Sequence, residues 1–187
     1  MTNLKPQTNV VIVGGGTAGW MTAAALSKLL GKTLNVRLVE SEEIGTVGVG
    51  EATIPTLMTL HRLLKIDEAA FLKATQGTIK LGIQFENWQK EGHQYFHSFG
   101  YTGEGCWAAG FQHFWLKGQQ LGLGDPDYGQ YAPELVAAQA EKFGFLKPVP
   151  LSYAYHMDAS GYARFLREVL FPVSRCVKSR KPMVQAV

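Results

Sequence analysis

The sequence has few of the features that would assign a protein to a class at once. Its 187 residues include only two cysteines, Cys106 and Cys176, which have no metal-binding spacing and imply no disulfide framework. No apolar run approaches the ~20 residues of a membrane-spanning helix, and the polar residues 1–9 carry no secretory signal pattern. We therefore expect a cytoplasmic protein that does not span a membrane.

Charge of one sign and clusters of metal ligands are also scarce. The net charge of +3 is too small to indicate a nucleic-acid partner. The five histidines have no metal-ligand spacing, so no metal site is expected. No G-x-S-x-G segment occurs, which argues against a serine hydrolase. Hydrophobic residues make up 46% of the chain, which is enough for the core of a globular protein.

A glycine-rich turn lies between an expected strand, residues 10–13, and an expected helix, residues 20–30. The turn reads Gly14-Gly15-Gly16-Thr17-Ala18-Gly19. In a dinucleotide-binding fold Gly14 would make the tight turn, and Gly16 would let the backbone approach a pyrophosphate. Gly19 would let the helix pack close to the strand. The free N–H groups of the helix N-terminus would then face the phosphate charge.

A second expected strand, residues 36–39, ends on an acidic residue. Glu40 follows Gly19 by 21 residues, about the distance at which an acid binds a ribose hydroxyl in these folds. Strand, turn, helix, strand and acid together predict a nucleotide-binding βαβ unit. An ordinary glycine-rich loop in an α/β protein is the alternative.

The segment after Glu40 favours FAD over NAD. A plain NAD domain would soon continue into another crossover helix, whereas three glycines and two threonines between Gly45 and Thr53 oppose a regular helix. A long extended loop beside the nucleotide suits a bulky flavin.

The motifs GGGTAGW and GVGEATIP together resemble the flavin-dependent tryptophan halogenases and their relatives. Further matches lie at residues 77–88, 95–100 and 154–159, in family order, so that the resemblance covers about residues 10–171. It implies that the GVGEATIP loop lies over FAD and links the flavin to the substrate site. The cofactor-binding residues that it implies are Gly14, Gly16, Thr17, Ala18, Gly19, Glu40, Val49, Gly50, Glu51 and Ala52.

The main chemical candidate is Lys80. Apolar residues alternate along 79–85, which predicts a strand with Lys80 on its polar face, beside the open space left by Gly82. This pattern alone indicates a solvent-facing lysine. The resemblance implies instead that Lys80 is catalytic, because the matching lysine of the family binds or captures hypohalous acid. An ammonium can hydrogen-bond this oxidant, and a desolvated amine can be a nucleophile.

The resemblance also implies the co-substrates. FAD arrives reduced, as FADH2, from a separate flavin reductase, and with oxygen it converts a halide to hypohalous acid. The substrate is a small electron-rich aromatic such as tryptophan or indole. His97 and Phe99 match positions that hold its ring, although core packing is the alternative for both. A hydroxylating flavin monooxygenase and a non-catalytic nucleotide-binding fragment remain alternative functions.

We thus expect an α/β fold: the FAD-binding, Rossmann-like βαβ start of a flavin monooxygenase-type fold, incomplete, with an irregular substrate-side segment. The expected parts are an FAD-binding part at 1–91, a substrate-side segment at 92–171 and a basic tail at 172–187. The last fifteen residues hold four basic residues and no acidic one, and show neither helical nor strand periodicity. We expect a truncated or frame-shifted chain that is inactive alone; a natural short variant is the alternative.

Overall fold

The computed structural model describes residues 8–31, 33–41, 50–145, 147, 150–170 and 176–179. It contains two compact units. The first comprises Met1–Ala52, Thr56–Thr78 and His156–Val187, and the second comprises Thr53–Pro55 and Ile79–Tyr155. The domain boundaries expected from the sequence, after residues 91 and 171, stay predictions.

The first unit begins with the expected βαβ arrangement. Strand β1 (Thr8–Val13) leads through the glycine-rich turn into α1 (Thr17–Leu30), and β2 (Leu34–Ser41) follows. Strands β1 and β2 are parallel neighbours, with Val10 opposite Val36. Helix α1 begins earlier than the expected residue 20, so the last residues of the turn already form its first turn. The α/β class and the parallel start are therefore confirmed.

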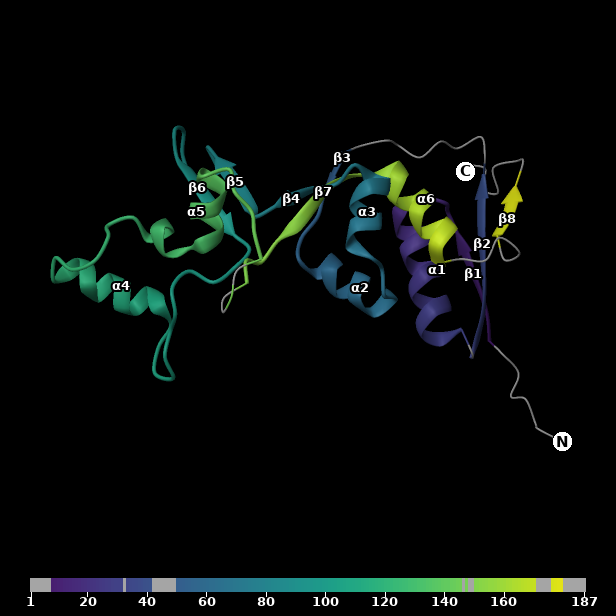
Figure 1. Ribbon diagram of the computed structural model, residues 1–187, viewed down its shortest axis with the longest axis horizontal. Helices are drawn as coiled ribbons and strands as arrows, with labels where there is room; N and C mark the ends of the chain where they lie inside the picture. Colours follow the sequence, from purple (N-terminus) through teal and green to yellow (C-terminus); the bar gives the residue numbers. More distant parts are fainter. Residues whose placement is uncertain are drawn as a thin grey trace. The chain divides into compact units, whose positions relative to one another are not determined.

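A third strand extends this sheet and corrects the account of the tail. Strand β8 (Cys176–Ser179) is parallel to β2, so the strand order is β1-β2-β8, as Figure 1 shows. The expectation of a tail without regular structure is wrong at these residues. Main-chain pairing with the free edge of β2 stabilises such a strand without any apolar period, so its own sequence carries no signal. The flanking residues 171–175 and 180–187 lie outside the described part.

Three further helices complete the first unit. They are α2 (Thr56–Leu64), α3 (Glu68–Thr75) and α6 (Ala159–Leu170), and α6 packs against α1 and α3 (Figure 1). The side chain of Asp67 accepts a hydrogen bond from the Ala70 N–H at 2.8 Å and caps α3. Asp158 likewise accepts from the Gly161 N–H at 2.9 Å and caps α6.

Strand β3 (Gly50–Ala52) is the described end of the glycine-rich loop. It runs antiparallel to β7 (Ala154–Asp158), with Glu51 opposite Met157. Residues 42–49 of the loop lie outside the described part, so the arrangement expected for them is not seen.

The second unit contains a β-hairpin and two short helices. Strand β5 (Gly82–Glu86) pairs antiparallel with β6 (Gln94–Ser98), with Gly82 opposite Ser98. Helix α4 (Phe111–Gln120) comes next, and a 3-10 turn (Tyr128–Tyr131) and α5 (Pro133–Gln139) follow. The expectation of an irregular segment at 92–171 is wrong at β6, whose hydrogen bonds come from its pairing with β5.

The single strand expected over residues 79–85 is two strands. Strand β4 (Thr78–Lys80) ends before Leu81, and β5 begins after it. The two strands belong to different sheets, so the alternating apolar residues do not form one continuous face. Among the described residues, no helix combines the length and the apolar character needed to cross a membrane.

Candidate functional site

The glycine-rich turn of the first unit is closely tied to both neighbouring elements. Gly14 has a φ of +122°, which side-chain-bearing residues rarely adopt, and its N–H donates to the Val39 carbonyl at 2.9 Å. A Cβ atom at Gly19 would collide with the Gly14 carbonyl oxygen. The helix therefore approaches the strand as closely as the absence of a side chain at residue 19 permits.

The start of α1 has the geometry of an anion site. Gly16 occupies the N-cap position of the helix in an extended conformation and, as a glycine, provides no side-chain cap for the first-turn N–H groups. A Cβ atom at Gly16 would meet nothing within 4 Å, so there is open space beside this turn. The N–H groups of a helix start next to open space fit a phosphate of a bound nucleotide. Ala18 is exposed in the same turn.

Glu51 lies next to this helix start. The Thr17 hydroxyl donates to Glu51 Oε1 at 3.4 Å. The described end of the GVGEATIP loop, Gly50 to Ala52, is thus brought to the glycine-rich turn. Val49 lies outside the described residues.

Glu40 stands at the end of β2, as expected, but it already has a partner. Its Oε1 lies 2.9 Å from Nη1 of Arg167 on α6, and its side chain is only 14% exposed. The Arg167 guanidinium lies 5.7 Å from the ring centroid of Trp20. A ribose at Glu40 would therefore meet a carboxylate engaged in an ion pair. Sequence reasoning missed Arg167 because residues 127 positions apart share no local pattern.

In the second unit Lys80 is not a freely solvated lysine. It is half-buried, its Nζ donates to the Thr53 carbonyl at 3.1 Å, and the same atom lies 5.3 Å from the ring centroid of Phe99. Burial lowers the pKa of Lys80 below its usual value. The open space expected above Gly82 is absent, because the ring of Phe96 fills it.

The two residues expected to hold the substrate ring are placed differently. Phe99 follows β6, is half-buried, and donates its N–H to the Leu81 carbonyl at 3.1 Å. His97 lies on β6 opposite Ile83 and is exposed to solvent. The structure therefore brings Phe99 to Lys80 and leaves His97 accessible on the hairpin.

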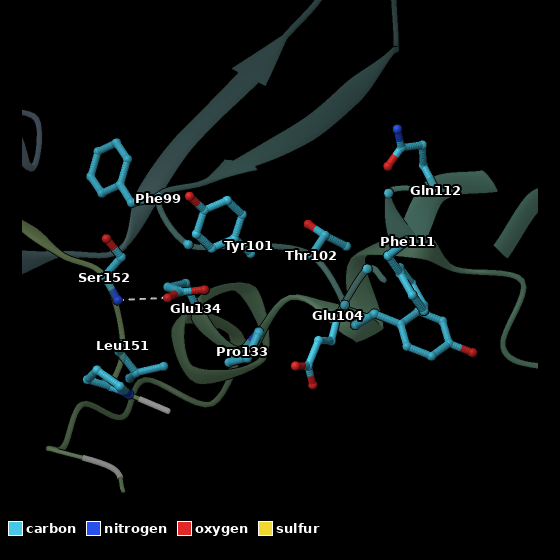
Figure 2. A pocket seen from close by; sticks show the side chains of 16 residues that line it. Phe99, Tyr101, Thr102, Glu104, Phe111, Gln112, Pro133, Glu134, Leu151 and Ser152 are labelled. Carbon is cyan, nitrogen blue, oxygen red and sulfur yellow. Dashed lines mark hydrogen bonds between the residues drawn. The ribbon is translucent and has the colours of Figure 1, made fainter. Parts of the chain in front are cut away.

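A cavity of about 840 Å³ lies beside Phe99 in the second unit. Figure 2 shows its labelled side chains, with Phe99, Tyr101 and Phe111 among the aromatic ones. The cavity is lined by residues 99–105, 110–112, 131, 133, 134 and 150–152. The described residues of its lining include aromatic rings and two glutamates but no lysine, arginine or histidine. A flat aromatic molecule suits such a surface.

Sequence reasoning missed a buried acidic residue of this cavity. Glu134 on α5 is only 3% exposed, and it accepts hydrogen bonds from the Ser152 N–H at 2.7 Å (Figure 2) and from the Ser98 hydroxyl at 3.0 Å. The Pro-Glu pair at the start of a helix is typical of a solvated first turn, so nothing in the local sequence predicts burial. Among the described residues, no group of three or more His, Cys, Asp or Glu side chains could hold a metal ion.

The fold and the glycine-rich turn are those of an α/β protein that begins with a Rossmann-like βαβ unit, and comparison with known proteins narrows this class. A family model described as tryptophan halogenase matches residues 9–187. The chain is 33% identical over 177 residues to tryptophan 6-halogenase ThaL from Streptomyces albogriseolus. The aligned region covers 84% of this chain and 33% of ThaL. It is 34% identical over 175 residues to tryptophan 7-halogenase RebH from Lentzea aerocolonigenes, with 84% and 33% covered.

Solved structures agree with these matches. A flavin-dependent halogenase from Xanthomonas campestris superposes with a TM-score of 0.87 at 56% identity, covering 98% of this chain and 37% of that protein. For the flavin-dependent halogenase BrvH from Brevundimonas sp. BAL3 the TM-score is 0.77 at 37% identity, with 92% and 35% covered.

The chain belongs to the tryptophan halogenase family. It spans about a third of the length of the full-length relatives compared above. The expectation that the family pattern stops near residue 171 is wrong, because the family model matches to residue 187. The tail that lacks a local period is therefore part of the family's sequence.

Proposed function

We propose that this chain is the N-terminal part of a flavin-dependent halogenase that acts on an electron-rich aromatic such as indole or tryptophan. The observation that carries the proposal is the placement of Lys80, whose half-buried amine is held by the Thr53 carbonyl and lies against Phe99. These contacts distinguish Lys80 from a solvent-facing lysine, which the strand pattern alone indicates. Membership of the tryptophan halogenase family agrees with this placement.

The first unit holds the cofactor in this proposal. Gly14, Gly16 and Gly19 keep the turn compact and leave space for the FAD phosphates, which the N–H groups near Thr17 and Ala18 bind. Glu40 would bind the ribose while it remains paired with Arg167. The other contacts with the cofactor would come from the loop residues Val49, Gly50, Glu51 and Ala52. When bound in its reduced form, FAD supplies the oxidation of halide by oxygen.

Lys80 transfers the halogen. Its ammonium can donate a hydrogen bond to the oxygen of hypohalous acid and polarise it. Because burial lowers the pKa of Lys80, a larger fraction of the side chain is the neutral, nucleophilic amine than for an exposed lysine. Phe99 and His97 would hold the aromatic ring of the substrate, with the aromatic walls of the cavity beside Phe99 excluding water.

The partners follow from the same proposal. A halide is the co-substrate, and a separate flavin reductase supplies FADH2. We also propose that residues 1–187 alone do not turn over, since the full-length relatives with which the chain aligns are about three times as long.

The test is product analysis by mass spectrometry. A protein of family length that begins with this chain is incubated with an indole panel, flavin reductase, FAD, NADH and oxygen, with and without bromide. A product with the bromine isotope pattern, formed only with bromide, is expected. A bromide-independent gain of one oxygen atom would replace the halogenase by a hydroxylating monooxygenase. The same assay on the 187-residue chain should give no product.

A further inference from the structure

A buried carboxylate lies beneath the segment that carries Phe99. Glu134 belongs to the first turn of α5, and it is only 3% exposed. Charged side chains are almost never buried to this extent unless they are paired or hydrogen-bonded. The hydrogen bonds of this carboxylate therefore indicate its structural role.

Each oxygen of the carboxylate binds a different segment. Oε1 accepts the Ser152 N–H at 2.7 Å, and Oε2 accepts the Ser98 hydroxyl at 3.0 Å. The Ser98 hydroxyl oxygen in turn accepts the Gly100 N–H at 3.3 Å. A Cβ atom at Gly100 would collide with the carboxylate, so the main chain passes directly over it.

Both neighbours of Phe99 are thus fixed by one side chain. Phe99 itself donates its N–H to the Leu81 carbonyl at 3.1 Å, and its ring lies 5.3 Å from Lys80 Nζ. A short series of contacts runs from Glu134 through Ser98 and Gly100 to Phe99, and from its ring to Lys80.

We propose that Glu134 is a positioning residue that fixes the Phe99 ring against the Lys80 ammonium. It touches neither Lys80 nor a substrate, and it acts through the main chain on either side of Phe99. The consequence for halogenation rests on the proposed function; the positioning itself does not.

The role depends on an acceptor of this length. Glutamine can keep the bond from the Ser152 N–H, and its amide can donate to the Ser98 hydroxyl, which can rotate to accept. Alanine would leave the Ser152 N–H and the Ser98 hydroxyl without their acceptor. Glu134→Gln therefore keeps the hydrogen bonds of the side chain, whereas Glu134→Ala removes them, and comparing the two variants tests whether these bonds are needed.

The experiment is NMR spectroscopy of the isotope-labelled 187-residue chain without flavin, halide or substrate. The Lys80 ε-methylene resonance, assigned with Lys80→Arg, should be shifted by the ring current of Phe99, and Phe99→Leu should remove this shift. Glu134→Ala is expected to remove most of it and Glu134→Gln to keep it. Glu104→Ala is the control, because Glu104 is an exposed carboxylate of the same cavity and should leave the shift unchanged.

Folding of the second unit is monitored in the same spectra through the indole N–H of Trp115, which donates to the Asp125 carbonyl at 3.0 Å. If Glu134→Ala fails to fold, Ser98→Ala removes the hydroxyl that joins the carboxylate to Gly100 and should reduce the shift. An unchanged Lys80 resonance in a folded Glu134→Ala or Ser98→Ala chain would overturn the proposal. Because no turnover is measured, this result is independent of whether Lys80 is catalytic.

Discussion

The two units bury their aromatic residues to different extents. In the first unit Trp20, Phe71 and Tyr162 are almost completely buried, and the Phe71 and Tyr162 rings lie 5.4 Å apart in an edge-to-face contact. In the second unit Tyr101 is 93% exposed and Trp107 is 99% exposed. Tight packing of rings stabilises the first unit, whereas the second unit keeps aromatic surface accessible to solvent.

Among the substitutions that test this difference in packing, Phe71→Ala is expected to have the largest effect on stability. Phe71→Ala should lower the free energy of unfolding of the first unit by about 3–5 kcal/mol, because it leaves a cavity among buried rings. Phe114→Ala in α4 should cost less than about 1 kcal/mol, since Phe114 is 49% exposed. Urea titrations of both variants give the two values. Equal losses would mean that the two units are packed alike.

A buried histidine gives the first unit a dependence on pH. His61 is 6% exposed and hydrogen-bonds the Tyr162 hydroxyl at 2.8 Å. Burial lowers the pKa of His61 from 6.5 to about 4, although the charge of Glu68 opposes the shift. The unfolded chain therefore binds this proton more readily than the folded one, and stability that is complete above about pH 6.5 is lost as the pH falls toward 4.

At pH 4 and below, the loss should reach about 3 kcal/mol, as the difference between the two pKa values implies. His61→Gln should abolish this part of the pH dependence, since glutamine can still bond to Tyr162 but does not titrate. His113→Gln, on the exposed face of α4, should leave it unchanged. Urea midpoints between pH 7.5 and 4 measure the effect; parallel curves for parent and His61→Gln would contradict the account.

The glycine-rich turn offers the next test, in a protein of family length. Gly16→Val should weaken FAD binding at least about 100-fold, because its side chain would occupy the space that a phosphate needs. Gly144→Val is a matched control in the second unit, since a Cβ there also meets nothing within 4 Å. Quenching of flavin fluorescence reports the affinity. Equal affinities of the Gly16→Val and parent proteins would remove the phosphate-binding role of this turn.

Features that depend on neighbouring residues could be predicted from the sequence, whereas features that depend on distant residues could not. A signal confined to a few residues was sufficient for the tight turn at Gly14, which is present. Strand β8 depends on the edge of β2, and the ion pair of Glu40 depends on Arg167. Neither partner lies within reach of a local pattern.

The candidate site was predicted only in part for the same reason. Lys80 and Phe99 were selected by resemblance, and the structure brings them together. The space above Gly82 was expected to be open because glycine lacks a side chain, yet Phe96 from the paired strand fills it. Glu134 was missed because its burial results from contacts with Ser98 and Ser152, which are distant in sequence.

The most direct test of the central claim is substitution of Lys80 in a protein of family length. Lys80→Ala should eliminate the halogenated product while FAD binding and the oxidation of reduced flavin continue, because the role proposed for the lysine comes after the oxidation of the halide. Lys73→Ala, which removes an exposed lysine of α3, should leave product formation unchanged. Halogenation by Lys80→Ala at a rate comparable to that of the parent protein would show that Lys80 has no catalytic role.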